Sequence, residues 1–252
     1  MSAQIKVLIV GETWLTTATH TKGFDSFVTS SYGEGYSFLK RALEEGGYSV
    51  EVMPNETAAL TFPDNLEALK AYDVVVLSDI GANTLLLTPT TWKQSKKTTN
   101  RLQLIRDYVE GGGGLVMIGG YLTFTGIEAK GFWKDTPVEA SLPVRLMATD
   151  DRSEHPEGVS ATVVKADHPL LAGVEGAWPA MLGYNRVSLA EGAELVATVG
   201  EDPLLAATTC GAGRTVAFMS DCSPHWLPPE FLSWAGYAPL FCNICGWAAG
   251  RA

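Results

Sequence analysis

Residues 101–126 constrain the fold most strongly, because a helical pattern, a glycine run and an apolar run follow one another without a break. The first part places apolar side chains on one face of a helix, namely Leu102, Ile105, Tyr108 and Val109. Glycines 111–114 then end the helix, since a helix terminus commonly needs a residue with positive φ. Residues 115–118 (Leu-Val-Met-Ile) are typical of a strand buried on both faces of a parallel sheet.

This central strand runs into a tight turn, Gly119-Gly120-Tyr121, here called the elbow. A sharp turn after a buried strand is where several families of α/β enzymes hold a nucleophile, because the turn lifts one side chain clear of the sheet. Tyr121 holds that place here, and we predict a hydrogen-bond donor or general acid, or else a side chain that merely fills the space. The glycine run 111–114 is not a phosphate loop, because it precedes a strand and no Lys-Ser/Thr follows it.

The order of elements predicts an α/β fold, with a flavodoxin-like, doubly wound and mostly parallel sheet and helices on both faces. Expected strands at 5–10, 48–53, 73–81, 115–118 and 213–221 alternate with helices, the first of them at 35–45. Residues 13–31 and 82–98 are expected to be long loops, and residues 124–133 a short helix. Short strand candidates fill a β-rich insertion at about 137–210, and residues 229–246 close the chain as helical structure. No linker rich in Pro or Ser divides the chain, so residues 1–252 are expected to form a single domain.

Composition excludes several classes of partner. A formal charge of -10 disfavours nucleic acid and anionic membranes, since both attract clustered Lys or Arg. No apolar run reaches membrane-spanning length, and the N-terminus enters a strand instead of a signal peptide. Four cysteines suit free thiols in a reducing compartment, and Cys242 and Cys245 read as buried small hydrophobes in a helix. We therefore expect a cytoplasmic protein whose partner is a small polar molecule.

Carboxylates follow two of the expected strands. Glu12 comes after the first strand and Asp79 after the third, at the edge where open α/β sheets bind ligands. They could act as a general base or bind an amine or hydroxyl group, although capping of the following loops explains them nearly as well. Together with Gly81, Gly120 and Leu122 they form the predicted ligand-binding set.

The last core strand ends in a second polar group, Asp221, Cys222 and His225. A Cys-x-x-His spacing can provide a thiol and its base or two metal ligands, and it can also be a plain polar strand end. Further metal ligands would have to come from Glu12, Asp79 or His20, and nothing local supplies them. We therefore predict neither a metal nor a cofactor.

Several of these features together resemble the class I glutamine amidotransferase-like proteins, including the group related to trehalose-utilisation proteins. The resemblance is carried by the helix ending in Tyr-Val-Glu-Gly-Gly-Gly at 108–113, the strand and elbow at 114–120, Asp-His-Pro-Leu at 167–170 with Gly173, and Gly-Ala-Gly-Arg at 211–214 leading to Ser220-Asp221. It implies a flavodoxin-like core with the site at the elbow after the central strand.

In the amidotransferases that the chain resembles, the elbow reads Gly-x-Cys-x-Gly, and a histidine activates the cysteine that attacks glutamine. Gly119, Tyr121 and Thr123 take the three named positions here. A tyrosine hydroxyl with a pKa near ~10 is a poor nucleophile, so we predict that cysteine-dependent glutamine hydrolysis is lost.

Histidines elsewhere in the chain offer weaker candidates. His155-Pro156-Glu157 spells the family's His-Pro-Glu triplet but follows a polar turn, so His155 is expected in a surface loop. His168, before a proline, is expected to form a turn. In the family that the chain resembles, the triplet ends a buried strand late in the core, and the strand end that corresponds to it here lies at 220–225.

Three functions remain open at this stage: a pocket protein or hydrolase using Tyr121, Asp221 or His225, a hydrolase or amidase with Cys222 and His225 as nucleophile and base, and a non-catalytic subunit. The third would use an interface formed by the Trp-rich C-terminal segment, and a homo-oligomer is possible.

Overall fold

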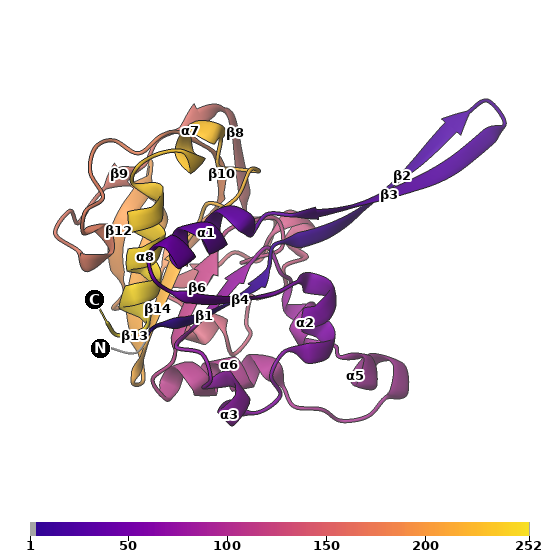
Figure 1. Ribbon diagram of the computed structural model, residues 1–252, viewed down its shortest axis with the longest axis horizontal. Coiled ribbons are helices and arrows are strands. Elements are labelled where there is room, and N and C mark those ends of the chain that lie inside the picture. The colour runs from indigo at the N-terminus through magenta and orange to yellow at the C-terminus, as the bar shows by residue number, and fades with distance from the viewer. Residues whose placement is uncertain (1–3, 252) are drawn as a thin grey trace.

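The computed structural model describes residues 4–251, which build an eight-stranded central sheet with helices on both sides (Figure 1). The strand order is β4-β1-β5-β6-β14-β13-β12-β9. The first five strands run parallel, and their order along the chain, 2-1-3-4-5, is that of flavodoxin-like sheets. Their bounds are β4 (Ser49–Met53), β1 (Lys6–Gly11), β5 (Val74–Ser78), β6 (Gly114–Ile118) and β14 (Gly213–Phe218). The predicted fold class is confirmed.

Alternate side chains of the parallel strands build two separate cores. Val7 and Ile9 of β1 pack on one face of the sheet, whereas Leu8 and Val10 pack on the other. The first face is covered by α1 (Ser37–Glu45) and α8 (Tyr237–Ala248), with α7 (Pro229–Leu232) nearby. The second face is covered by α2 (Asn55–Thr61), α3 (Leu66–Leu69) and α6 (Arg101–Glu110) (Figure 1). Strands buried on both faces explain why their sequences are continuously apolar.

The antiparallel half of the sheet comes from the β-rich segment. Strands β13 (Asp202–Cys210), β12 (Glu194–Val199) and β9 (Thr162–Val163) extend the sheet beyond β14. Two small sheets lie beside it, one pairing β7 (Val144–Leu146) with β11 (Val187–Leu189), the other β8 (Arg152–Val159) with β10 (Met181–Asn185). The prediction of a surface loop at His155 is wrong, because His155 lies half-buried in β8 and stacks on Tyr184.

The prediction of a long loop at residues 13–31 is also wrong. The chain instead forms a two-stranded antiparallel ribbon, β2 (Thr13–Lys22) and β3 (Asp25–Glu34), that projects from the body (Figure 1). Its threonines and aromatic residues favour strands. Both faces of the ribbon are solvent-exposed, so the alternation of apolar and polar residues that marks a half-buried strand is missing.

Two other local predictions need correction. The expected loop at residues 82–98 contains two short helices, α4 (Ala82–Leu86) and α5 (Pro89–Gln94). The expected helix at residues 124–133 is a single 3₁₀ turn, Ile127–Ala129, because Phe124, Glu128 and Phe132 all have positive φ. Among residues 4–251, no helix combines the length and the apolar composition that crossing a membrane requires.

Candidate functional site

The carboxyl ends of β1, β5, β6 and β14 meet at one edge of the sheet, where a cavity of about 450 Å³ opens. It is lined by Glu12, Trp14, Asp79, Tyr121, Leu122, Ile127, Asp221, Ser223, Pro224 and His225. The sheet therefore brings together most of the side chains selected from the sequence. Gly81 and Gly120 lie in the same loops but do not line the cavity, and His20 lies away from it on β2, stacked on Phe27.

The elbow after β6 depends on two glycines for different reasons. The amide of Gly119 donates to the carbonyls of Phe218 and Ser220, and a Cβ at Gly119 would lie 2.2 Å from the carbonyl oxygen of Met219. Gly120 has φ 154°, which side chains rarely adopt, and a Cβ there would lie 3.1 Å from Asp79 Oδ1. The turn after Gly120 carries Tyr121 into the cavity wall.

Tyr121 sits between two side chains from other parts of the chain. Its ring meets the His225 ring edge-on, with centroids 4.1 Å apart and planes 86° apart. The guanidinium of Arg152 lies 5.0 Å from the centroid of the same ring and also pairs with Asp150. A phenol between an imidazole and a cation is suited to donating a hydrogen bond into the cavity.

A buried pair from the β-rich segment holds the elbow, and the sequence reasoning missed both members. Asn185 Oδ1 accepts from the Gly120 amide at 3.0 Å, while Asn185 Nδ2 donates to Asp151 Oδ1 at 2.8 Å. Asp151 also accepts from the amides of Thr125 and Gly126, at 2.8 and 2.9 Å. Both side chains are fully buried. The turn is therefore fixed by side chains that enter from the small sheet of β8 and β10.

Asp79 supports the outgoing end of the same turn. Its Oδ1 accepts from the Leu122 amide at 2.9 Å, so this amide positions the loop. Burial raises the pKa of Asp79, as does the neighbouring carboxylate Asp221, against the lowering effect of the Leu122 amide. Asp79 has φ 42°, a strained value for a residue with a side chain.

Asp221 organises the loop after β14. Asp221 Oδ1 accepts from the amides of Cys222 and Ser223 and from Ser223 Oγ, at 2.6, 3.0 and 3.0 Å. Asp221 Oδ2 lies 3.2 Å from His225 Nδ1. A carboxylate against one ring nitrogen orients an imidazole and fixes its tautomer, which is how histidine bases are commonly held. The other nitrogen, Nε2, makes no hydrogen bond within residues 4–251.

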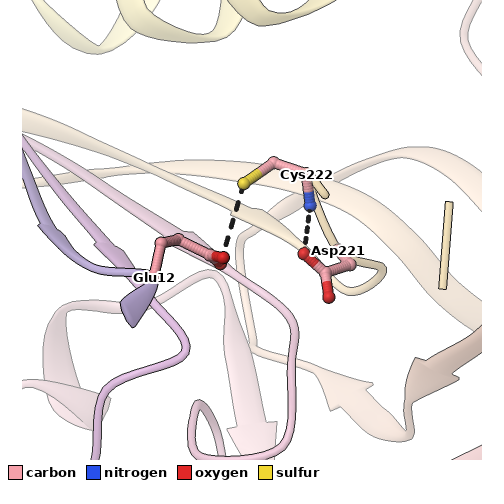
Figure 2. Close-up of side chains that lie close together, drawn as sticks. All are labelled: Glu12, Asp221 and Cys222. Carbon is pink, nitrogen blue, oxygen red and sulfur yellow. Dashed lines mark hydrogen bonds between the residues drawn. The ribbon is translucent and has the colours of Figure 1, made fainter. Parts of the chain in front are cut away.

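Glu12 closes the bottom of the cavity and is almost completely buried. Ser78 Oγ donates to Glu12 Oε1 at 2.5 Å, and the Cys222 thiol lies 3.7 Å from the same oxygen (Figure 2). Burial raises the pKa of Glu12 well above its ordinary value, and the charges of Asp221 and Asp79 raise it further. Three carboxyl groups around one cavity cannot all ionise without cost, so Glu12 holds a proton most readily.

Cys222 lies beneath the cavity, and its side chain is fully buried. Burial raises the pKa of its thiol, and the charge of Glu12 adds to this effect. Its sulfur contacts Ser78 and Glu12, whereas the hydrogen bond of the His225 ring goes to Asp221. Within residues 4–251 no hydrogen bond joins the Cys222 thiol to His225, and a buried thiol with a raised pKa is a poor nucleophile.

Glu12, Asp221 and Cys222 are also the only group in residues 4–251 with three metal-ligand atoms close together, all within 4.8 Å of one another (Figure 2). Both oxygens of Asp221 already have partners: Oδ1 accepts from the amides of Cys222 and Ser223, and Oδ2 pairs with His225 Nδ1. Glu12 Oε1 likewise accepts from Ser78 Oγ, so the protein's own donors engage carboxylate oxygens of both acids.

The remaining candidates from the sequence serve the fold. His168 caps a 3₁₀ turn by accepting from the Leu170 amide at 3.1 Å, in agreement with its predicted turn role. Cys242 and Cys245 are free thiols on α8, and Cys245 is fully buried.

Comparisons with known proteins agree with this architecture. The family model described as "Putative glutamine amidotransferase" matches residues 6–250. Two solved structures from Salmonella typhimurium are similar over nearly the whole chain. Cytoplasmic protein STM3548 is 44% identical, with a TM-score of 0.94 over 97% of this chain and 99% of its own. Cytoplasmic protein STM1381 is 43% identical, with a TM-score of 0.93 over the same shares. A search of curated proteins gives no match.

More distant likeness extends to a "Putative thua-like protein" from Parabacteroides merdae, which is 15% identical, with a TM-score of 0.58 over 98% of this chain and 90% of its own. At that identity the likeness concerns the fold alone. The match over residues 6–250 places the chain in the glutamine amidotransferase-like family.

Proposed function

We propose that the protein binds a small polar molecule at the elbow cavity and has lost cysteine-dependent glutaminase activity. The observation that carries the proposal is the pair of positions Tyr121 and Cys222. The elbow position of the family's nucleophile carries a phenol, and the nearest thiol is sealed below the cavity with a raised pKa. Without a thiolate at the cavity, attack on a glutamine amide has no nucleophile.

The lining suits a ligand that carries hydroxyl or amino groups. His225 Nε2 and the Tyr121 hydroxyl offer hydrogen-bonding groups beside the Asp79 carboxyl group, and Trp14 and Tyr121 add aromatic walls. A cavity of about 450 Å³ falls within the range of small-molecule sites. We also propose a cytoplasmic location, on the strength of the two cytoplasmic proteins of Salmonella typhimurium to which the chain is similar.

Native mass spectrometry of the gently purified protein tests the binding proposal. We expect a bound species of small mass that Asp79→Asn removes and that the exposed control Asp107→Asn retains. A ligand kept equally by both variants would place binding elsewhere and contradict the proposal.

A second candidate function is hydrolysis of a small polar substrate with His225 as general base. The observation that favours it is the contact of 3.2 Å between Asp221 Oδ2 and His225 Nδ1, because it directs the free Nε2 to a water or substrate. Tyr121, against the His225 ring, would donate a hydrogen bond to the oxygen that gains charge.

An ester and amide substrate panel tests this second function. His225→Gln should lower any turnover by about 10²–10⁴-fold. His155→Gln, a change outside the cavity, should leave the turnover unchanged. Equal loss in both variants would argue against a base at His225.

A further inference from the structure

Apart from Trp14, which lines the cavity, the ribbon of residues 13–34, here called the arm, takes no part in the site. Its two ten-residue strands pair without interruption from Thr13 with Glu34 to Lys22 with Asp25. They begin beside Glu12 and Trp14 of the cavity lining and project away from the body (Figure 1). At about 3.4 Å per residue, each strand spans about 34 Å. That reach exceeds the radius of gyration of about 18 Å expected for a domain of this length.

Both faces of the arm expose large apolar side chains, namely Trp14, Leu15, Phe24, Phe27, Val28 and Tyr32. Leu15 is 70% exposed, and Phe24 at the tip is completely exposed. Leu15 pairs with Tyr32 across the strands, so these two side chains share a face. Between residues 14 and 33 the only charged side chains besides a histidine are Lys22 and Asp25, which oppose each other next to the turn. The surface is therefore apolar, rich in hydroxyl groups and nearly uncharged.

A ribbon of this kind is not expected to persist alone in water. An isolated two-stranded hairpin is marginally stable at best. The outer edges of β2 and β3 have no further strand among residues 4–251, and the arm contains no proline to block pairing. Proteins normally cover or charge such edges because they pair with other chains.

The base of the arm is nevertheless anchored to the body. Thr13 Oγ1 accepts from the Asn55 amide at 2.8 Å and donates to Glu56 Oε2 at 3.1 Å. The hydroxyl of Tyr32 donates to Glu56 Oε1 at 2.9 Å. The direction of the arm is thus fixed before any partner arrives, which lowers the ordering cost of binding.

We propose that the arm is an association element that binds a second copy of this chain. Its 22 residues, 13–34, match the roughly 20–30 residues per side of a stable protein interface. A formal charge of -10 makes two bodies repel, whereas residues 14–33 of the arm carry one Lys and one Asp and therefore no net charge. Self-association also lets each chain both offer an arm and receive one, as a two-fold dimer requires.

The same features disfavour other occupants. Nucleic acid would require clustered basic residues, and the arm has one lysine. An anionic membrane would repel the acidic body, and the apolar side chains lie along the whole ribbon instead of being confined to its tip.

Sedimentation equilibrium of the full chain across about 1–100 μM tests the proposal. We expect a dimer or larger assembly. In the deletion variant an Asn-Gly turn replaces residues 15–32, which joins Trp14 to its partner Gly33 through a two-residue hairpin loop. This variant keeps Trp14 in the cavity wall, and we expect it to be a monomer. A monomeric wild type, or a deletion variant that keeps the oligomeric state of the wild type, would overturn the proposal.

A double variant, Leu15→Lys with Val28→Lys, covers the case in which the deletion fails to fold. It should weaken association at least about tenfold. The matched control Leu60→Lys, at an exposed apolar position on α2 that is 62% exposed, should not change association. Equal effects of both would contradict the role of the arm.

Trypsin gives an independent readout, because Lys22 is the single basic cleavage site in the arm. Cleavage after Lys22 should be slow in concentrated protein and faster on dilution. A cleavage rate independent of concentration, or a monomer that binds vesicles of phosphatidylcholine and phosphatidylglycerol, would overturn the proposal. Neither outcome bears on ligand binding at the cavity, which the arm-deleted protein should retain.

Discussion

The parallel half of the central sheet and the small sheet of β8 and β10 contribute to the site in different ways. The parallel half delivers the cavity side chains, among them Tyr121 and Asp221, from the carboxyl ends of its strands. The small sheet of β8 and β10 delivers Asn185, on β10, and Asp151, directly before β8; neither lines the cavity, but both hold the elbow through hydrogen bonds. The chemistry of the site and the rigidity of the site thus come from different regions of the chain, and they can be perturbed separately.

Removal of the support from the small sheet of β8 and β10 should have the largest effect. Asp151→Ala leaves the amides of Thr125 and Gly126 and the Asn185 side chain without their acceptor. We expect a loss of about 3–5 kcal/mol in the free energy of unfolding, measured by urea denaturation. The adjacent control Asp150→Ala, whose ion pair with Arg152 is partly exposed, should cost about 1 kcal/mol or less. Equal losses would show that the buried pair does not carry the elbow.

Crowding at the elbow should have the next largest effect. Gly119→Ala places a Cβ 2.2 Å from the Met219 carbonyl oxygen, so backbone must move. We expect a loss of about 1–3 kcal/mol and weaker ligand binding. Gly81→Ala provides the control at the same edge, since its nearest contact would be 3.6 Å away, from the Lys130 carbonyl. If Gly119→Ala were as harmless as Gly81→Ala, the elbow would be looser than the structure shows.

In the parallel half, the ionisation of Glu12 should make the stability of the fold depend on pH. The folded state raises the pKa of Glu12 above its ordinary 4.5, so it binds this proton more tightly than the unfolded chain does. Stability should therefore fall as pH rises from the unfolded pKa through the raised folded pKa, by at most about 1.4 kcal/mol per pH unit. Glu12→Gln stays neutral and should gain stability relative to wild type between pH 5 and 8. Thermal unfolding at both pH values measures this, and a difference that does not change with pH would contradict a protonated Glu12.

The smallest effect is expected at the His-Pro-Glu triplet. His155 contacts Ser153 and Glu157 and stacks on Tyr184, and it does not line the cavity. His155→Ala should change the free energy of unfolding by about 1 kcal/mol or less and leave ligand binding intact. Loss of binding in this variant would show that the small sheet of β8 and β10 has a direct part in the site.

The sequence predicted the parallel half well because its signals are local. Apolar runs, turn glycines and polar strand ends placed Tyr121, Asp79 and Asp221 at one edge, where the structure brings them together. The contact between Asp221 and His225 could also be predicted, since the two residues lie only four positions apart in the chain.

The support for the elbow had no such signal. Asn185 lies 65 residues from Gly120 and 34 from Asp151, in short strands between polar turns, and only tertiary pairing joins them. The arm was missed for another reason: with solvent on both faces, nothing imposes a period of two on its apolar residues.

Ammonia release from glutamine tests the loss of thiol chemistry at the cavity most directly. Wild type and Cys222→Ala should both release ammonia at the rate of a buffer blank, because Cys222 is buried and protonated and Tyr121 cannot replace a thiolate. Release well above the blank in wild type, abolished by Cys222→Ala, would contradict this prediction and restore a cysteine nucleophile to the protein.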